Sequence, residues 1–181
     1  MSYLEPKNPE TITGEHKALF DQINNAFGAV PNMFKVIGNS SAALESMWTS
    51  FGALSKGKIG AKLGEQIAVL VANMNRCEYC LSAHTVLGQN VGVSAEDMAK
   101  AQEGRSSDPK TQAALDFSAK LVKNHGQVSQ NDISSVRNAG FNDEEIAEIL
   151  AHVALNIFTN YTNIAFDVTL DFPKTELRAA A

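Results

Sequence analysis

Residues 65–84 read EQIAVLVANMNRCEYCLSAH, and this stretch decides the fold of the chain. Its first half, Ile67–Met74, is the most apolar region of the sequence. An apolar run this dense predicts a helix that is buried on most of its sides. Asn75-Arg76 is predicted to be a joint, and a second helix is predicted to begin near Cys77 and to run to about Asn90.

The flanking sequence follows the same helical spacing, and Gly and Pro fall between the helical segments. Helices are predicted over about Gly14–Phe27 and Met33–Ile37, from Ser40 or Ser41 to Leu54, after Ser94, after Asp108, from Ser129 to Gly140, and from Asn142 to roughly Phe172. Capping residues mark several of these starts, including a capping-box pattern at Asn142 and Glu145. The prediction is an all-α bundle forming one domain over 1–172. The remaining segment, 173–181, is expected to be a disordered C-terminal tail.

Composition excludes several classes of function. The chain has 181 residues and a net charge of -5, with a pI of about 5.3. A nucleic-acid surface needs clustered Lys and Arg to meet phosphates, so no nucleic-acid partner is expected. No run of 18 apolar residues exists, so no membrane span is expected. The polar N-terminal sequence lacks the apolar region of a secretory signal, so a cytoplasmic location is the expectation.

The chain has two cysteines, Cys77 and Cys80, which are three positions apart. A reducing cytosol disfavours a structural disulfide. A disulfide that closes so short a loop would also remove little entropy from the unfolded chain. The two thiols are therefore expected to matter through their chemistry.

Cys77, Cys80 and His84 stand at i, i+3 and i+7, which places them on one stripe of the second helix. A thiol must ionise to act as a nucleophile, and a helix N-terminus favours the thiolate. A histidine one turn away can take the proton, and the second thiol can capture an oxidised first one as a disulfide. The histidine favours Cys80 as the nucleophile, whereas the helix dipole favours Cys77, which is nearer the N-terminus of the helix. We give more weight to the histidine and predict that Cys80 is the nucleophile.

Glu65 lies among apolar residues on the preceding helix. If the two helices pack antiparallel, its carboxylate can face His84 and orient the ring. Alternatively, Glu65 sits near an exposed helix start and is only solvated. Residue types alone favour neither interpretation.

Other interpretations of these residues stay open. Glu65, Cys77, Cys80 and His84 could supply four zinc ligands, although structural zinc sites usually draw on two separate knuckles. The cysteines could also be a buried, inert pair. His152, Asn156 and Asn160 form a polar stripe on the last helix, which is interpreted as a subunit contact or a core hydrogen-bond network rather than as catalytic. Trp48 and the phenylalanines at helical spacing are interpreted as core.

The spacing of Glu65, Cys77, Cys80 and His84 is E-x11-C-x2-C-x3-H. It resembles the signature of the alkylhydroperoxidase D-like proteins in the carboxymuconolactone decarboxylase family. The upstream segment Phe27–Phe34, FGAVPNMF, is similar to the entry region of that family's longer members.

The resemblance implies an all-α fold that assembles as a homo-oligomer: a dimer, trimer or hexamer. It implies a thiol peroxidase that reduces hydrogen peroxide or organic hydroperoxides and is recharged by a thiol reductant or redox protein, with no cofactor and no metal. Glu65, Cys77, Cys80 and His84 would be the catalytic residues. In the family, the cysteine matching Cys80 attacks the peroxide and the one matching Cys77 is its more accessible partner.

One position departs from the family pattern. Well-studied members carry a relay histidine immediately before the second cysteine, and Tyr79 stands there in this chain. The departure bears on how fast a peroxidase reaction can be here. Members named for lactone decarboxylation generally lack the C-x-x-C pair, so its presence argues against that reaction. Two rival functions stay open: a dithiol–disulfide exchange partner of another protein, and a non-enzymatic oligomeric or zinc-binding helical module.

Overall fold

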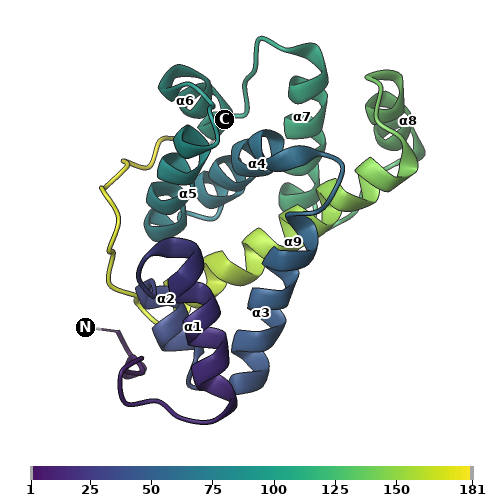
Figure 1. The fold of residues 1–181 in the computed structure, drawn as a ribbon. Coiled ribbons are helices and arrows are strands. Elements are labelled where there is room, and N and C mark those ends of the chain that lie inside the picture. Colours follow the sequence, from purple (N-terminus) through teal and green to yellow (C-terminus); the bar gives the residue numbers. More distant parts are fainter. Residues whose placement is uncertain (1, 180–181) are drawn as a thin grey trace.

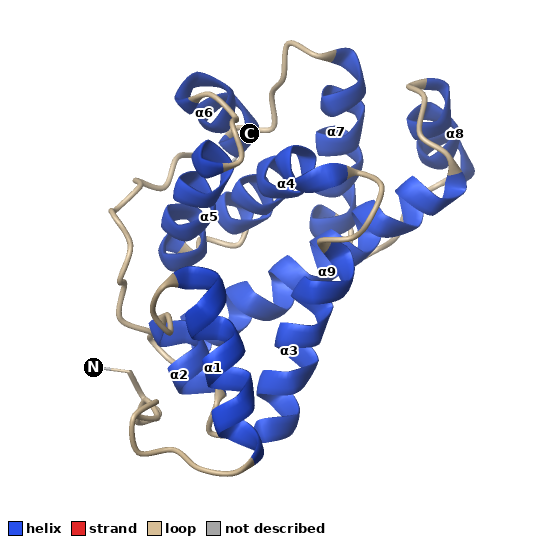
Figure 2. Cartoon of the chain, in the orientation of Figure 1, coloured by secondary structure: helices blue, strands red, loops and turns tan. Residues whose placement is uncertain are grey.

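The computed structural model describes residues 2–179 (Figure 1). Over this range the chain forms nine α-helices and no strand, as Figure 2 shows. The helices are α1 (Glu15–Phe27), α2 (Asn32–Ile37), α3 (Ser41–Leu54), α4 (Gly60–Met74), α5 (Glu78–Asn90), α6 (Ala95–Gln102), α7 (Pro109–Lys123), α8 (Gln130–Asn138) and α9 (Asp143–Ala165). The predicted all-α class is confirmed.

Helix α4 forms the centre of the bundle and packs against α5, α6, α7 and α9 (Figure 1). Gly64 and every residue from Gln66 to Asn73 are buried. This burial is the reason for the dense apolar run, because a helix surrounded by other helices needs apolar side chains on nearly all of its faces. The prediction for this segment is confirmed.

The helix starts follow the capping signals in the sequence. Ser40, Ser94 and Asp108 each accept a hydrogen bond from the backbone N–H three residues on. Full capping boxes form at Ser129 and at Asn142. Each such cap stabilises a helix by about 1 kcal/mol, so these residues fix where the helices begin.

The first three helices form a separate group on one side of the molecule (Figure 1). Helix α3 packs against α1, α2 and α9, and α2 also contacts α9. The pair α4–α5 also packs against α9. The candidate site lies between these two groups of helices.

Helix α9 ends earlier than predicted, at Ala165 instead of near Phe172. Asp167 adopts a left-handed conformation with φ of 48°. A right-handed helix cannot continue through a residue in this conformation. The N–H of Val168 then donates to the carbonyl of Asn163 at 3.0 Å, in the manner of a Schellman cap. The apolar residues beyond Ala165, which are Phe166, Val168, Leu170 and Phe172, stand at every second position. This is not helical spacing, and the prediction carried the helix past its end.

The segment expected to be a disordered tail, 173–181, makes ordered contacts over its described part, 173–179. Its backbone N–H groups at Thr175 and Arg178 donate to Ser82 Oγ and to Asn73 Oδ1, both at 2.9 Å. The carbonyl of Glu176 accepts from Gln102 Nε2 at 2.9 Å. Three buried polar side chains therefore hold the tail along α4, α5 and α6. The expectation of a disordered tail is corrected for residues 173–179, because these contacts join residues that are far apart in the sequence. Residues 180–181 lie outside the described part.

The outer face of α9 exposes an apolar stripe. Leu150, Phe158, Tyr161 and Ile164 are 49%, 37%, 59% and 47% exposed. They recur at helical spacing on one side of the helix. Separately, no helix among the described residues is both long and apolar enough to cross a membrane.

Candidate active site

A tight turn between α4 and α5 sets the position of both cysteines. The N–H of Cys77 donates to the carbonyl of Ala72 at 2.9 Å, and that of Arg76 to Asn73 at 3.2 Å, which is a Schellman cap on α4. Arg76 takes the left-handed position with φ of 61°, where glycine is usual. A non-glycine residue there costs about 1 kcal/mol, so the turn that aims Cys77 at the start of α5 is slightly strained.

Cys77 is itself the N-cap of α5. Its sulfur accepts a hydrogen bond from the N–H of Cys80 at 3.3 Å. Both cysteines are free thiols, and both are buried. The sequence analysis placed the start of α5 near Cys77 correctly. A cysteine in place of the usual Ser, Thr, Asn or Asp cap is the feature that brings the two sulfurs to the same end of the helix.

Cys80 is set up to ionise. Burial raises the pKa of Cys80, but a hydrogen bond from Cys77, the positive charge of His84 and the amides of Asn163 and Asn160 outweigh it and lower that pKa to about 7. The pKa of Cys77 is raised, because its thiol donates to Cys80 and because it is buried. The arrangement therefore favours a thiolate on Cys80 and a neutral thiol on Cys77.

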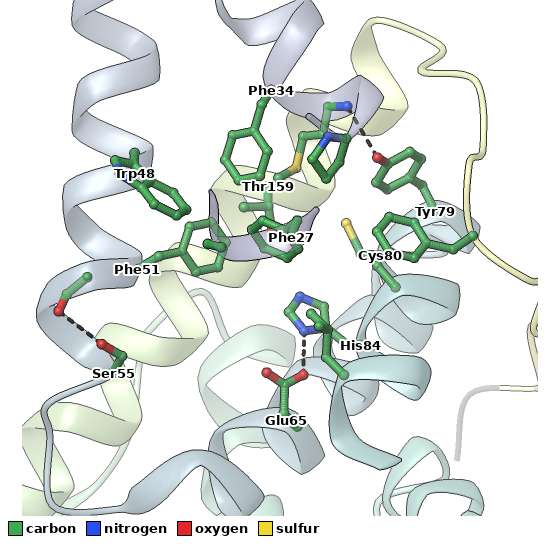
Figure 3. Close-up of a pocket in the computed structure, with 17 residues that line it drawn as sticks. Phe27, Phe34, Trp48, Phe51, Ser55, Glu65, Tyr79, Cys80, His84 and Thr159 are labelled. Carbon is green, nitrogen blue, oxygen red and sulfur yellow. Dashed lines mark hydrogen bonds and ion pairs between the residues drawn. The ribbon is translucent and has the colours of Figure 1, made fainter. Parts of the chain in front are cut away.

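His84 lies one turn after Cys80 and is paired with Glu65. The distance from His84 Nδ1 to Glu65 Oε2 is 2.7 Å (Figure 3). Burial lowers the pKa of His84, whereas the charge of Glu65 and the hydrogen bond to it raise that pKa, and the net shift is upward. Of the two interpretations of Glu65, the paired one agrees with this geometry. The carboxylate holds the ring with its other nitrogen free to serve the thiolate.

Helix α9 contributes residues that the sequence analysis missed. Asn163 Nδ2 donates to Cys80 Sγ at 3.1 Å, to the Thr159 carbonyl at 3.0 Å and to Met33 Sδ at 3.2 Å. Asn160 Oδ1 accepts from Asn75 Nδ2 at 3.0 Å, which ties α9 to the turn before Cys77. The polar stripe of His152, Asn156 and Asn160 indicated a polar face on this helix. Asn163 extends that face, but it follows Asn160 by three residues instead of four and was not included.

A pocket of about 410 Å³ opens beside Cys80 and His84 (Figure 3). Its walls come from α1, α2, α3, α4, α5, α9 and the segment after α9. The aromatic residues among them are Phe27, Phe34, Trp48, Phe51, Tyr79 and Phe172. The interpretation of Trp48 and the phenylalanines as core is therefore incomplete, because they contact one another as a core would and also line the pocket.

Tyr79 stands where the family relay histidine would be, and it is not placed as a proton relay. Its hydroxyl oxygen accepts from the N–H of Met33 at 3.2 Å. Burial and the neighbouring Asp171 raise the pKa of Tyr79, so the phenol stays neutral. Its ring meets Phe172 edge to face, with centroids 5.7 Å apart. Tyr79 therefore shapes the pocket wall next to Cys80.

A second cavity of about 130 Å³ lies behind the Glu65–His84 pair. His152 and Asn156 of α9 line it together with that pair. The Nε2 atom of His152 is buried there without a hydrogen-bond partner, and burial lowers the pKa of this histidine. The polar stripe on α9 thus faces the back of the site rather than standing apart from it.

Among the side chains that the structure describes, no three His, Cys, Asp or Glu converge on a possible metal position. The zinc interpretation of Glu65, Cys77, Cys80 and His84 therefore finds no support in the geometry. The hydrogen bonds instead pair Glu65 with His84, and Cys77 with Cys80.

The sequence model of the carboxymuconolactone decarboxylase family matches residues 42–123, which contain the whole motif from Glu65 to His84. Residues 42–123 belong to the carboxymuconolactone decarboxylase family. The resemblance that the motif indicated is confirmed. Members of this family include enzymes, among them decarboxylases.

Solved structures share the fold over nearly the full chain. A peroxidase-related protein from Silicibacter sp. TM1040 is 24% identical, with 91% of this chain and 93% of that one covered and a TM-score of 0.79. An alkylhydroperoxidase AhpD core protein from Ralstonia eutropha JMP134 is 20% identical, with coverage of 94% and 92% and a TM-score of 0.85. The alkylhydroperoxidase D-like fold that was predicted is thus confirmed.

A third similar structure shows that this fold also serves other chemistry. It is a cysteine-to-alanine variant of the debrominase Bmp8 in complex with 2,3,4-tribromopyrrole, 20% identical, with coverage of 93% and 91% and a TM-score of 0.78. At these identities the three structures show the fold alone. No curated protein matches the chain.

Proposed function

We propose that this protein is a thiol peroxidase that reduces hydroperoxides through Cys80 and Cys77. The single observation that carries the proposal is the position of Cys80. Its sulfur lies at the floor of a pocket, stabilised as a thiolate and next to a histidine that is held by Glu65. A low-pKa thiol beside a proton donor is the arrangement that peroxide reduction requires.

In the first step the Cys80 thiolate attacks the outer oxygen of the hydroperoxide. An S–O bond forms, the O–O bond breaks, and the organic oxygen leaves as an alkoxide. His84, in its protonated form, gives a proton to that alkoxide to produce the alcohol. Cys80 is left as a sulfenic acid, and Glu65 stabilises the charged ring before the transfer.

In the second step Cys77 resolves the sulfenic acid. Its sulfur attacks the sulfur of Cys80, a disulfide forms, and the hydroxyl group leaves as water with the proton of the Cys77 thiol. The two sulfurs are already at the same end of α5, where Cys77 interacts with the N–H of Cys80. Peroxide is thereby reduced by two electrons and the dithiol is oxidised by two.

The cycle closes when two thiols of an external reductant reduce the disulfide by exchange. Cys77 borders a separate cavity of about 370 Å³, which is also lined by Ile164 and Leu170. This side of the motif is the proposed approach for a small dithiol or a redox protein. A reducing compartment such as the cytoplasm would supply it.

Peroxide turnover tests the proposal. Consumption of hydrogen peroxide is measured with thioredoxin, glutathione or dihydrolipoamide as the reductant, for the unmodified protein and for Cys80→Ser. We expect turnover with at least one reductant and none for Cys80→Ser. If peroxide leaves the dithiol reduced while a protein disulfide oxidises it, the protein is an exchange partner instead, and the peroxidase proposal is wrong.

A further inference from the structure

The walls of the pocket beside Cys80 are mainly hydrophobic. They are largely apolar and aromatic, and the side chains that carry polar groups are those of Trp48, Ser55, Glu65, Tyr79, Cys80, His84 and Thr159. No lysine or arginine lines it. The catalytic groups gather at the Cys80 end, and Trp48 and Phe51 stand across the pocket from them (Figure 3).

We propose that this pocket binds neutral, apolar molecules that contain an aromatic ring, with their reactive group directed to Cys80. As a statement about the substrate, this rests on the proposed function. The substrate is then a bulky aromatic hydroperoxide rather than hydrogen peroxide. As a statement about which ligands the pocket holds, it stands on the pocket alone.

The size of the pocket excludes a close fit to hydrogen peroxide. At roughly 30 Å³ for each water in the liquid, about 410 Å³ corresponds to on the order of a dozen water molecules. Water gains few hydrogen bonds from apolar walls, and its displacement by an apolar ligand favours binding. A ring-sized ligand therefore gains affinity here that a small polar peroxide cannot.

Charge selects against acidic ligands. A bound carboxylate would lie near the thiolate of Cys80 and the carboxylate of Glu65, with no lysine or arginine in the wall to meet it. The positive charge of His84 already faces these two groups. Burying a further unpaired negative charge in an apolar pocket is strongly unfavourable, so neutral ligands are preferred.

Contacts between the aromatic rings hold the walls of the pocket in place. Phe34 meets Trp48 edge to face, with centroids 5.8 Å apart, and meets Phe51 at 6.2 Å. Phe172 is held against Tyr79 in the same manner. Such contacts add about 1 kcal/mol each beyond burial, so they fix the rings and keep the pocket open for a ligand.

A direct binding measurement tests the proposal. Trp48 is the only tryptophan in the chain and lines the pocket, so its fluorescence reports on occupancy. The probes are 2-phenyl-2-propanol, tert-butanol as a match without the ring, and 2-phenylpropanoate as a charged match. We expect a saturable change with 2-phenyl-2-propanol, at a Kd about tenfold or more below that of the other two.

A variant places the binding event in the pocket. Gly52 lies in the wall on α3, and a Cβ added there meets no atom within 4 Å. Gly52→Phe should weaken binding of 2-phenyl-2-propanol by about tenfold, because its ring occupies space that the ligand would use. Gly52→Ala is the matched control and should bind within about twofold of the unmodified protein. Circular dichroism of both variants checks the fold.

The outcomes separate this proposal from the proposed function. Equal or tighter binding of 2-phenylpropanoate, or no saturable change with any probe, overturns the ligand class even if peroxide is turned over. Neutral-ring binding without any oxidation of Cys80 by cumene hydroperoxide overturns the peroxidase instead. If both hold, the ratio of rates with cumene hydroperoxide and hydrogen peroxide should fall in Gly52→Phe, and an unchanged ratio contradicts the substrate class.

Discussion

The side-chain amide nitrogen of Asn163 lies 3.1 Å from the sulfur of Cys80, across the interface between α9 and α5. This amide also donates to the carbonyl of Thr159, one turn earlier on its own helix. The second bond fixes the direction of the first. Asn163 therefore presents a donor to the sulfur that stabilises the thiolate more than the thiol.

Replacement of Asn163 by leucine should raise the pKa of Cys80. A hydrogen bond to a charged group contributes about 1.5–3 kcal/mol, which corresponds to a shift of about 1 to 2 pH units. The thiolate absorbance of the variant should therefore appear at higher pH in a titration of the reduced protein. Asn131→Leu, on an exposed part of α8, is the matched control. An unshifted titration in Asn163→Leu would show that the amide does not stabilise the thiolate.

The reaction with peroxide should depend on pH through Cys80, whose pKa is lowered to about 7. The rate of Cys80 oxidation should rise as pH increases through about 7 and then level off, because only the thiolate reacts. In His84→Gln the positive charge is lost, so the rise should move toward about 8.5, the ordinary cysteine value. At pH 7 the variant should react about tenfold or more slowly.

A matched substitution at an exposed histidine, His125→Gln, should leave the pH profile in place. A profile that stays at the same pH in His84→Gln would assign the low pKa to another group. The measurement is the single-turnover oxidation rate at several pH values, without added reductant.

The two cysteines should behave asymmetrically toward one equivalent of peroxide. Cys77→Ser should gain one oxygen and stop at a sulfenic acid that can be trapped, because Cys80 is the stabilised thiolate. Cys80→Ser should not react. Intact mass measures both results. A sulfenic acid on Cys77 in Cys80→Ser, with an inert Cys77→Ser, would reverse the assignment.

Asn73 should be important for stability, because its buried Oδ1 accepts from both Gln102 Nε2 and the N–H of Arg178, at 3.1 and 2.9 Å. Asn73→Leu leaves the Gln102 amide and the N–H of Arg178 without this acceptor and should lower the free energy of unfolding by about 2–3 kcal/mol. Urea unfolding measures the loss. Asn138→Leu at an exposed site should change the midpoint little, and an equal loss there would refute the argument.

The apolar stripe on α9 supports the predicted homo-oligomer. Tyr161 and Ile164 are about half exposed, and a two-fold contact between such stripes would bury them. Light scattering at micromolar concentration should give the mass of an oligomer, and Tyr161→Glu with Ile164→Glu should lower it. Lys123→Glu, at an exposed position of α7, is the control. A monomer mass for the unmodified chain would end the prediction.

Much of the fold could be predicted because it is encoded locally. Residues such as Ser94, Asp108 and Asn142 mark helix starts by hydrogen bonds to their own next turn. The end of α9 was not predictable in this way. It depends on a left-handed Asp167, and the following chain is held by Asp171, whose carboxylate accepts from the N–H of Asn32 at 2.7 Å. Partners so distant in sequence leave no periodic signal.

The candidate site also combines features that are encoded locally with features that depend on residues distant in the sequence. Cys77, Cys80 and His84 could be placed together because one short segment carries them all. The pairing of Glu65 with His84 stayed one of two open interpretations, because it depends on how α4 packs against α5. The pocket walls were missed, because a phenylalanine at a core position and one at the edge of a cavity have the same sequence pattern.

Tyr79 borders both the pocket of Cys80 and the cavity of Cys77, and it separates them. Under the proposed function, we expect the oxidising substrate to enter through the pocket of Cys80 and the reducing substrate through the cavity of Cys77. Occupancy of one entrance by an unreactive compound then leaves the other free, so an alcohol product should compete with hydroperoxide but not with the thiol reductant. Steady-state rates should form parallel double-reciprocal lines, and a high concentration of either substrate should not block the half-reaction of the other.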